Sequence, residues 1–541
     1  MKIAIAQMNS YPGDINRNVQ NTIEYINKAK EQNVNLIVFP EMTIAGYLSM
    51  DLFQNQNFID ANKRGLEDVI KHTKGISAIV GFADSEGKMG PGAVPIVYNS
   101  AAIIQNKKLL GIQDKTLLPE YDIFDERRYF ASSRGTKVFD INGKKIGVQI
   151  CEDMWDSDYE EKVTSNLVSN GAEIIVNLSA SPYHMGKIAQ RKAQMQRHKG
   201  IPIVYANTVG VHDGYDGQVI FDGCSMALDL EGKIIVAGKK FQEDLIVIDF
   251  DKKNSKVIME EKQIADMYEA LVFGVKEYFG QFGNKSCAFV GLSGGIDSAL
   301  VAAIAKDALG KERVKGIAMP SKYSSNHSLT DAKSLAENLG IKYSVISIKE
   351  GVKSFEKMLK NEFIGTNPDV TEENIQARIR GNILMAESNK FGGIVLSTGN
   401  KTEMALGYCT LYGDMSGGLS VIADVDKLKV YEMARYRNSI SNVIPISSIE
   451  KAPTAELAPG QSDEKGLGST YDVLVPLVNE IIEDGKNKED LIGKYDEKLI
   501  DNTLRRIHLS EYKRRQAAPG FKVTKKSFGI GRRVPMSHNF F

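Results

Sequence analysis

Residues 291–298 read Gly-Leu-Ser-Gly-Gly-Ile-Asp-Ser, and they form the stretch of this chain best suited to bind an anion. The apolar run 287–290 before them is typical of a buried strand, and the alanine-rich run 299–308 after them is typical of a helix. A glycine-rich turn between a strand and a helix lets backbone N–H groups and the helix dipole face a phosphate. The alternative is an ordinary strand–turn–helix joint, but two serines and an aspartate beside the glycines favour a binding loop.

The same string lacks the Gly-Lys-Ser/Thr ending of the common nucleotide-binding loop. It resembles instead the pyrophosphate loop of the N-type ATP pyrophosphatases, which cleave ATP between its α and β phosphates and adenylate a substrate oxygen. The resemblance implies that the loop binds ATP and that Asp297 helps to hold Mg²⁺. The ATP-binding residues expected in the loop are Gly291, Leu292, Ser293, Gly294, Gly295, Ile296, Asp297 and Ser298.

A second set of reactive residues lies in the first half of the chain. Cys151 ends an apolar strand-like run, a usual position for active-site residues in α/β folds. That segment alone fits equally well a buried cysteine that packs as a small hydrophobe. Glu41 follows another strand-like run, and Lys115 begins the string Lys-Thr-Leu-Leu-Pro-Glu-Tyr. A thiol, a carboxylate and an ammonium supply the nucleophile, the base and the oxyanion partner that amide hydrolysis needs.

These three strings, in this order, resemble the nitrilase superfamily over nearly all of residues 1–250. The resemblance implies a four-layer α-β-β-α sandwich that hydrolyses amides or nitriles. Cys151 is then the nucleophile, and Glu41 takes its proton and returns it to the leaving ammonia. Lys115 stabilises the oxyanion together with the N–H of Glu152. Glu120 matches a second carboxylate of the superfamily, which positions the lysine or relays protons.

The superfamily members that use glutamine supply a further expectation. Tyr121 follows the Pro-Glu pair, Ser181 lies in the loop after the apolar run 174–178, and Lys187 comes six positions later. The resemblance implies that these three residues hold glutamine, and hydroxyls with a cation suit its α-carboxylate. The alternative is a turn with a solvated lysine.

A nitrilase-like half joined to a pyrophosphate loop resembles the glutamine-dependent NAD synthetases over almost the whole chain. Two other amidotransferase classes fit less well. One needs a cysteine exposed after methionine removal, where this chain has Lys2, and the other needs a glycine-flanked elbow that is missing around Cys151.

This resemblance implies further site residues in the second half. Asn374 and Arg378 lie one helical turn apart and so share a face. For Arg378 and Lys427 the alternative is a surface salt bridge, and for residues 513–515 it is a solvated basic run. Two carboxylates with bound phosphates suit octahedral Mg²⁺. The implied residues are Thr398, Lys427 and Thr454 for ATP, Asn374, Arg378, Glu403 and Lys513 for deamido-NAD, and Asp297 and Glu403 for Mg²⁺.

Some positions depart from the pattern of the ammonia-only relatives. Leu411 and Gly418 stand where those relatives carry a lysine and an aspartate, and Tyr512 stands in place of a histidine before Lys513. The way in which the pyridine or ribose end is held therefore stays open. Residues 459–469 are rich in Gly and Ser and read as a flexible loop, either a closing segment or a plain surface connection.

The elements that position these residues fall into two α/β domains, expected at 1–255 and 256–541. In residues 1–250, strand-like and helix-like segments alternate, as in a layered α/β domain. The polar run 251–256 reads as a linker, and the helical segment 264–279 opens a second domain with a doubly wound parallel sheet. The strands expected in the first domain are 2–8, 36–39, 77–82, 99–104, 145–151, 174–178, 203–207 and 245–249, and its expected helix is 18–32.

Composition narrows the class of protein. The 541-residue chain has a formal net charge of zero, which gives no electrostatic footprint for nucleic acid. No apolar run is long enough to span a bilayer, and the N-terminus lacks a signal-peptide cleavage region. Four scattered cysteines form neither a disulfide framework nor a zinc site, so we expect a cytoplasmic protein. We expect small molecules as its ligands, no nucleic-acid or membrane partner, and a homo-oligomer.

Taken together, the sequence predicts a glutamine-hydrolysing ligase. Ammonia released at Cys151 would react with a carboxylate that ATP has adenylated, giving NAD, AMP and pyrophosphate from deamido-NAD. The alternative is another pyrophosphate-loop amidotransferase that acts on a different carboxylate. A non-catalytic binding protein built on the same folds is disfavoured, because the reactive residues are complete.

Overall fold

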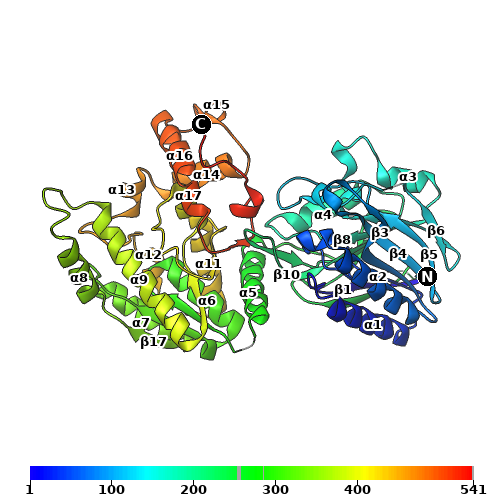
Figure 1. The fold of residues 1–541 in the computed structure, drawn as a ribbon, viewed down its shortest axis with the longest axis horizontal. Helices are drawn as coiled ribbons and strands as arrows, with labels where there is room; N and C mark the ends of the chain where they lie inside the picture. The colour runs from blue at the N-terminus through cyan, green and yellow to red at the C-terminus, as the bar shows by residue number, and fades with distance from the viewer. Residues whose placement is uncertain (134, 253–256, 284, 539–541) are drawn as a thin grey trace. The chain divides into compact units, whose positions relative to one another are not determined.

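The structure is a computed structural model that describes residues 1–538 except 134, 253–256 and 284 (Figure 1). It divides into two compact units. The first contains residues 1–214 and 219–261, and the second contains 215–218 and 262–541. The expected domain boundary at 255/256 and most of the expected linker 251–256 lie outside the described residues.

The first unit is built on two six-stranded sheets. Eight of its strands match those expected from the sequence, while the others were not foreseen. One sheet has the order β14-β1-β2-β3-β4-β5 and the other the order β13-β12-β9-β8-β7-β6. The strand bounds are β1 Lys2–Gln7, β2 Leu36–Val38, β3 Ser77–Met89, β4 Pro95–Gln105, β5 Lys108–Asp114, β6 Val138–Ile141, β7 Lys144–Ile150, β8 Ile174–Ser179, β9 Ile203–Asn207, β12 Met226–Leu228, β13 Ile234–Ala237 and β14 Asp244–Asp249.

The alternation of side chains explains why the two sheets stack. Along β1, Ile3 and Ile5 join residues of the second sheet, such as Val148 and Val176, in one buried core. The intervening Ala4 belongs to a different core on the outer face. Successive residues of a strand point to opposite faces, so both faces of β1 are apolar and both are covered.

Helices cover the outer face of each sheet. Helices α1 and α2 pack on the first sheet, and α3 and α4 lie on the second. Their bounds are α1 Ile15–Glu31, α2 Gln56–Lys71, α3 Val163–Ser169 and α4 Lys187–Gln196. The expected four-layer α-β-β-α sandwich is confirmed.

The second unit is built on a parallel sheet of order β17-β16-β15-β18-β19. The chain runs outward from β15 through β16 to β17, and then returns to the other side of β15 to form β18. The topological switch point therefore lies between β15 and β18, whose carboxyl ends form the usual ligand crevice of such sheets. The strands are β15 Cys287–Gly291, β16 Val314–Ala318, β17 Lys342–Val345, β18 Gly393–Ser397 and β19 Leu419–Ser420.

Helices cover both faces of this sheet, as expected for a doubly wound fold. On one face Phe289 and Val395 pack against Val352 of α8 and Leu384 of α9. Helix α6 contacts β15 and β16, and α5 and α11 pack against α6. The bounds are α5 Gln263–Gln281, α6 Ile296–Leu309, α7 Asn326–Leu339, α8 Lys349–Leu359, α9 Val370–Phe391, α10 Lys401–Leu406 and α11 Lys427–Ile440.

The rest of the second unit is mainly helical. The helices are α12 Ile446–Glu450, α13 Asp463–Leu467, α14 Tyr471–Ile482, α15 Lys488–Leu491, α16 Glu497–Leu509 and α17 Glu511–Arg514, with strand β20 Phe521–Lys522 near the end. The expectation of a loop throughout 459–469 is wrong in part, because α13 forms there. Its leucine, Leu467, is buried in an apolar cluster with Tyr471 and Leu474. Among the described residues, no helix combines the length and apolar character needed to cross a bilayer.

Two short strands, β10 Val209–Asp213 and β11 Gln218–Asp222, follow β9 in the chain. Residues 215–218 connect β10 to β11 and end at the first residue of β11. They belong to the second compact unit. There the N–H of Gln218 donates to the carbonyl of Gly520 at 2.8 Å.

Candidate active sites

Cys151 lies directly after β7, where the strand turns into a short 3-10 helix, η4 Cys151–Met154. Its backbone φ of +45° is in the left-handed region, which is unusual for a residue with a side chain and recurs at functional turns. The thiol is buried, and burial raises its pKa well above the ordinary value. The resting group is therefore a neutral thiol, so its attack on an amide needs a base.

Glu41 and Lys115 meet in the interior of the first unit. Lys115 Nζ lies 2.7 Å from Glu41 Oε1, and both side chains are fully buried. The other carboxylate oxygen of Glu41 accepts from the N–H of Ala180 at 2.8 Å, and Asn99 Nδ2 donates to Oε1 at 2.7 Å. Gly81 is required nearby, because a Cβ there would lie 2.4 Å from the Pro40 carbonyl. The charges of Glu41 and Lys115 both act on the pKa of Cys151, in opposite directions.

A third charged residue of this cluster is Glu126, which the sequence analysis missed. Its Oε1 lies 2.6 Å from Lys115 Nζ and accepts from the Tyr47 hydroxyl at 2.5 Å. Burial raises the pKa of Glu126 to about 7, helped by the Glu41 charge and opposed by Lys115. The expectation that Glu120 positions Lys115 is wrong. Glu120 is half exposed and pairs with Arg127 at 3.3 Å.

Asp153 ties the cysteine turn to the lysine turn. One carboxylate oxygen accepts from the N–H groups of Thr116 and Leu117 at 2.9 and 2.8 Å. The other accepts from the N–H of Ile150 at 3.0 Å. One buried carboxylate thereby links the end of β7, next to Cys151, to the segment that follows Lys115.

One of the three expected glutamine ligands, Tyr121, contacts Glu152, the neighbour of Cys151. The Tyr121 hydroxyl donates to both Glu152 oxygens at 3.0 Å. Burial raises the pKa of the Glu152 carboxyl, and the charges of Lys115 and Lys187 oppose that rise. Ser181 is buried and its Oγ accepts from Arg191 Nε at 3.1 Å. The structure therefore places Tyr121 against Glu152, the Lys187 ammonium 4.3 Å from the centre of the Trp155 ring, and Ser181 with a buried arginine.

The expected pyrophosphate loop lies at the carboxyl end of β15, at the switch point of the second sheet. Ser293 and Ser298 close it, with their Oγ atoms 3.1 Å apart. Gly294 has φ +80°, and a Cβ at that position would lie 2.3 Å from the carbonyl of Ser328. Only glycine fits there, which explains one of the two adjacent glycines.

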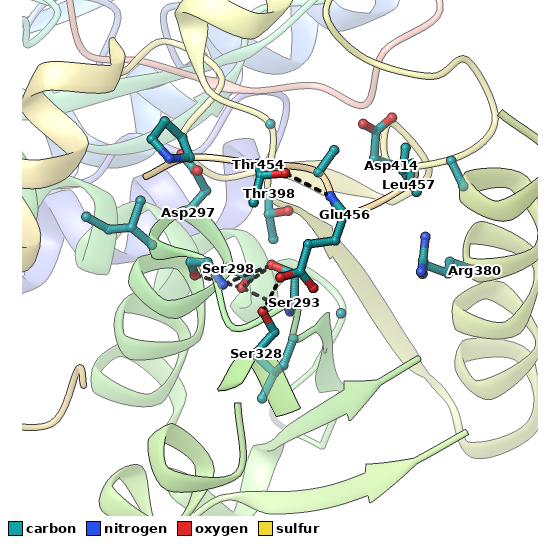
Figure 2. A pocket seen from close by; sticks show the side chains of 18 of the residues that line it. Ser293, Asp297, Ser298, Ser328, Arg380, Thr398, Asp414, Thr454, Glu456 and Leu457 are labelled. Atoms are coloured by element: carbon teal, nitrogen blue, oxygen red, sulfur yellow. Dashed lines mark hydrogen bonds between the residues drawn. The ribbon is translucent and has the colours of Figure 1, made fainter. Parts of the chain in front are cut away.

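A cavity of about 290 Å³ opens beside this loop, and Figure 2 shows part of its lining. Gly294 is buried rather than exposed to the cavity, and its carbonyl accepts from Ser448 Oγ at 3.0 Å. The expected ATP-binding residues that line the cavity are Gly291, Leu292, Ser293, Gly295, Ile296, Asp297, Ser298, Thr398, Lys427 and Thr454.

Asp297 and Glu403, the expected Mg²⁺ ligands, lie on either side of one lysine. Asp297 pairs with Lys427 Nζ, which is 3.7 Å from Glu403 Oε1, and Asn400 Nδ2 donates to Asp297 Oδ1 at 3.0 Å. Burial and the Asp297 charge raise the pKa of Glu403 to about 8, against the effect of Lys427. A divalent cation bound between Asp297 and Glu403 would supply the positive charge that favours the ionised form of Glu403, so the two carboxylates fit a hard cation.

Thr454 lies on the segment 451–457, all of whose residues line the cavity. Its hydroxyl donates to the carbonyl of Gln461 at 2.8 Å, and the N–H of Glu456 donates to Thr454 Oγ1 at 3.3 Å. The Glu456 carboxylate is anchored by Ser328 Oγ at 2.8 Å and Lys451 Nζ at 2.7 Å, as Figure 2 shows for the serine. The segment is thereby fixed to the start of α7.

Three of the expected deamido-NAD residues converge on a different place, the segment 407–411. Thr410 Oγ1 donates to Asn374 Oδ1 at 2.7 Å, and Arg378 Nε donates to the Leu411 carbonyl at 3.3 Å. Lys513 Nζ donates to the carbonyls of Gly407 and Cys409 at 2.9 and 2.7 Å. Asn374 and Arg378 thus share a helix face as expected, but neither lines the described cavity, whereas Glu403 does.

Comparison with known proteins identifies both halves of the chain. Residues 2–257 match the carbon-nitrogen hydrolase family, and residues 267–517 match the NAD synthase family. The whole chain is 39% identical to the glutamine-dependent NAD(+) synthetase of Thermotoga maritima over 585 residues, covering 100% of this chain and 99% of that protein. The chain belongs to the glutamine-dependent NAD(+) synthetase family. The member from Synechocystis is 40% identical over 556 residues, and the alignment covers 99% of this chain and 99% of that protein.

Solved structures of the family agree in fold. The glutamine-dependent NAD+ synthetase from Acinetobacter baumannii, in complex with ADP, has a TM-score of 0.77 at 37% identity and covers 99% of this chain and 98% of its own. The family member from Cytophaga hutchinsonii has a TM-score of 0.81 over 99% of this chain and 97% of its own. At 23% identity, it supports the fold alone.

Proposed function

We infer that the protein makes NAD from deamido-NAD, with ATP as co-substrate and glutamine as nitrogen donor. One observation carries this conclusion. A single chain that matches the family over its whole length holds a buried Cys–Glu–Lys cluster in one unit and a pyrophosphate loop beside a cavity in the other.

In the first unit, Cys151 Sγ attacks the amide carbon of glutamine, and Glu41 accepts the thiol proton. Because burial keeps the thiol neutral, this transfer must accompany the attack. Lys115 stabilises the oxyanion, with the N–H of Glu152 as second donor. The tetrahedral intermediate collapses, Glu41 returns the proton to the leaving ammonia, and a γ-glutamyl thioester remains until water hydrolyses it. Glu126 keeps the Lys115 ammonium fixed throughout.

Glutamine is held by charge and hydrogen bonds around the thiol. Lys187 and the hydroxyls of Tyr121 and Ser181 bind its α-carboxylate. Glu152 is the carboxylate next to them, and it suits the α-ammonium group. Arg191 holds the Ser181 loop by donating to the Ser181 carbonyl at 2.7 Å.

In the second unit, the nicotinate carboxylate of deamido-NAD attacks the α-phosphorus of ATP and pyrophosphate leaves. Adenylation is needed because a carboxylate is a poor electrophile. Ammonia then attacks the acyl carbon and displaces AMP. The pyrophosphate loop binds the leaving group with its backbone N–H groups, Ser293 and Ser298, and Thr398, Lys427 and Thr454 complete the ATP site.

Asp297 and Glu403 would hold Mg²⁺, which neutralises charge on the phosphates when bound. Asn374, Arg378 and Lys513 bind deamido-NAD through or beside the segment 407–411, while Glu403 reaches it from the cavity. Leu411, which differs from the ammonia-only relatives, lies in this segment, so its neighbours set how the pyridine or ribose end is held. We also expect a cytoplasmic homo-oligomer.

Exchange of labelled pyrophosphate into ATP tests this function. With no ammonia source, exchange should require deamido-NAD and should not occur with other carboxylic acids, because adenylation is reversible and substrate-dependent. Exchange that another acid supports equally well would favour a different amidotransferase of the same class. Glutamine hydrolysis without any exchange would refute the synthetase assignment.

Changing Glu41 to Gln and Lys115 to Met should each stop glutamine hydrolysis, by different routes. An amide cannot take the thiol proton, so thioester formation should stall in Glu41→Gln. A thioether keeps the bulk of Lys115 but loses its charge, which typically costs on the order of 100-fold to 1,000-fold in rate. Intact-mass detection of the γ-glutamyl thioester measures both effects.

Lys115→Met also leaves two buried carboxylates without their ammonium, so its thermal unfolding must be compared with that of the parent. Ammonia-driven synthesis should persist in both variants. Rapid accumulation of the thioester in Glu41→Gln would show that Glu41 is not the base.

A further inference from the structure

Arg380 is a cation at the cavity that the sequence analysis did not select. It lies on α9 and lines the cavity, and its Nε donates to the carbonyl of Met319 at 3.0 Å. Two positions along a helix differ by about 200°, so Arg380 and Arg378 cannot face the same way. Arg378 turns to the segment 407–411, and Arg380 projects into the space that Figure 2 shows.

The guanidinium of Arg380 is left incompletely satisfied by the protein. Within the described part of the chain, the bond to Met319 is the only hydrogen bond that it makes, and it forms no ion pair. Burial lowers the pKa of Arg380 to about 10, and the charges of Glu456 and Asp414 oppose that shift without forming an ion pair with the guanidinium. A cation that is partly withdrawn from water and still has N–H groups to donate is suited to a ligand.

The surroundings of Arg380 indicate which part of a ligand it meets. Met319 and Leu384 line the same cavity, and a Cβ on Gly291 would lie 3.3 Å from a terminal carbon of each. These side chains form an apolar wall at the ends of β15 and β16, beside the bond that fixes Arg380. An apolar wall next to a planar cation suits a flat aromatic ring.

The phosphate-binding groups lie elsewhere in the cavity. In Figure 2, Ser298 lies toward the left of the view and Arg380 toward the right, with Ser293 between them. A triphosphate seated on the loop would therefore direct its nucleoside away from the loop and toward α9.

We propose that Arg380 binds the adenosine half of ATP, its guanidinium contacting the purine face and the ribose hydroxyls. This inference rests on the proposed function, in which ATP is a co-substrate. Arg380 then also contacts the adenosine of the acyl-adenylate, because that half of ATP stays in place when pyrophosphate leaves.

Calorimetric titration of ATP, AMP and inorganic tripolyphosphate into the full-length protein tests the proposal. Arg380→Met should weaken binding of ATP and AMP by roughly 5-fold to 30-fold, the range expected for loss of a partly desolvated cation over a ring. Binding of tripolyphosphate should not change. Arg380→Lys should recover part of the loss, since it restores charge without the planar fork. Arg505→Met, an exposed residue of α16, is the matched control and should bind all three ligands like the parent.

Each other outcome is decisive. An equal loss for tripolyphosphate would place Arg380 on the phosphates and overturn the proposal, as would unchanged binding of AMP. If Arg380→Met unfolds, Arg380→Gln and Arg380→Lys carry the same comparison, with glutamine hydrolysis in the first unit as a check of integrity. A parent protein that binds no ATP would refute the proposed function itself, a result distinct from a failure of Arg380 alone.

Discussion

Replacing Cys151 by Ala should abolish NAD synthesis from glutamine and leave synthesis from ammonium salts largely intact. Cys151 is the proposed nucleophile of the first unit, so its loss should lower glutamine hydrolysis by roughly 10⁴-fold or more. The pyrophosphate loop belongs to the second unit and does not need the thiol when ammonia is supplied. The measurement compares NAD formation from ATP and deamido-NAD with glutamine or with a high concentration of ammonium.

Cys224→Ala is the matched control, because Cys224 is also buried in the first unit and also has a positive φ of 51°. It should keep both activities. The two-site scheme would be refuted by a folded Cys151→Ala protein that loses the glutamine-driven and ammonia-driven reactions equally.

The second large effect is expected at the paired carboxylates of the other unit. Asp297→Asn and Glu403→Gln should each stop NAD synthesis with either nitrogen source, by at least about 100-fold. An amide keeps the shape of the side chain but loses the negative charge that holds a hard cation. In Asp297→Asn it also removes the charge that pairs with Lys427.

The informative assay is again pyrophosphate exchange, because it reports adenylation without any ammonia. Exchange should be lost in both variants, whereas thioester formation at Cys151 should continue. Glu432→Gln, on the exposed side of α11, is the matched control and should exchange like the parent. Normal exchange in Asp297→Asn and Glu403→Gln would show that these residues hold no essential metal.

Local pattern accounts for much of the fold. Apolar runs between polar turns were sufficient to predict the central strands of the first unit, because β1, β2, β8 and β9 are buried on both faces. Strands such as β5, with exposed residues at 108–110, were not foreseen, because they carry no continuous apolar run. Helix α13 was not predicted for a similar reason, since a five-residue helix in a Gly- and Ser-rich stretch is too short to show a helical period of apolar residues.

The sequence predicted which residues lie at strand ends, but it did not predict which side chains they contact. Glu41, Lys115 and Cys151 belong to motifs in fixed local settings, and the structure buries all three. Glu126 begins a short 3-10 helix, η3 Glu126–Arg128, and no local sequence pattern distinguishes it from Glu120. Only the folded chain, through the buried bond to Lys115, makes that distinction.

The sequence by itself therefore determined the two-part α/β architecture, the reactive cluster around Cys151 and the loop 291–298. Each of these depends on the pattern of residues that are close together in the sequence. Tertiary structure decided which charges meet. It paired Lys427 with Asp297, turned Arg378 to the segment 407–411, and brought Arg380 to the cavity. The physical reason is that helix period fixes the angle between two side chains, while packing against distant strands fixes which of them faces the cavity.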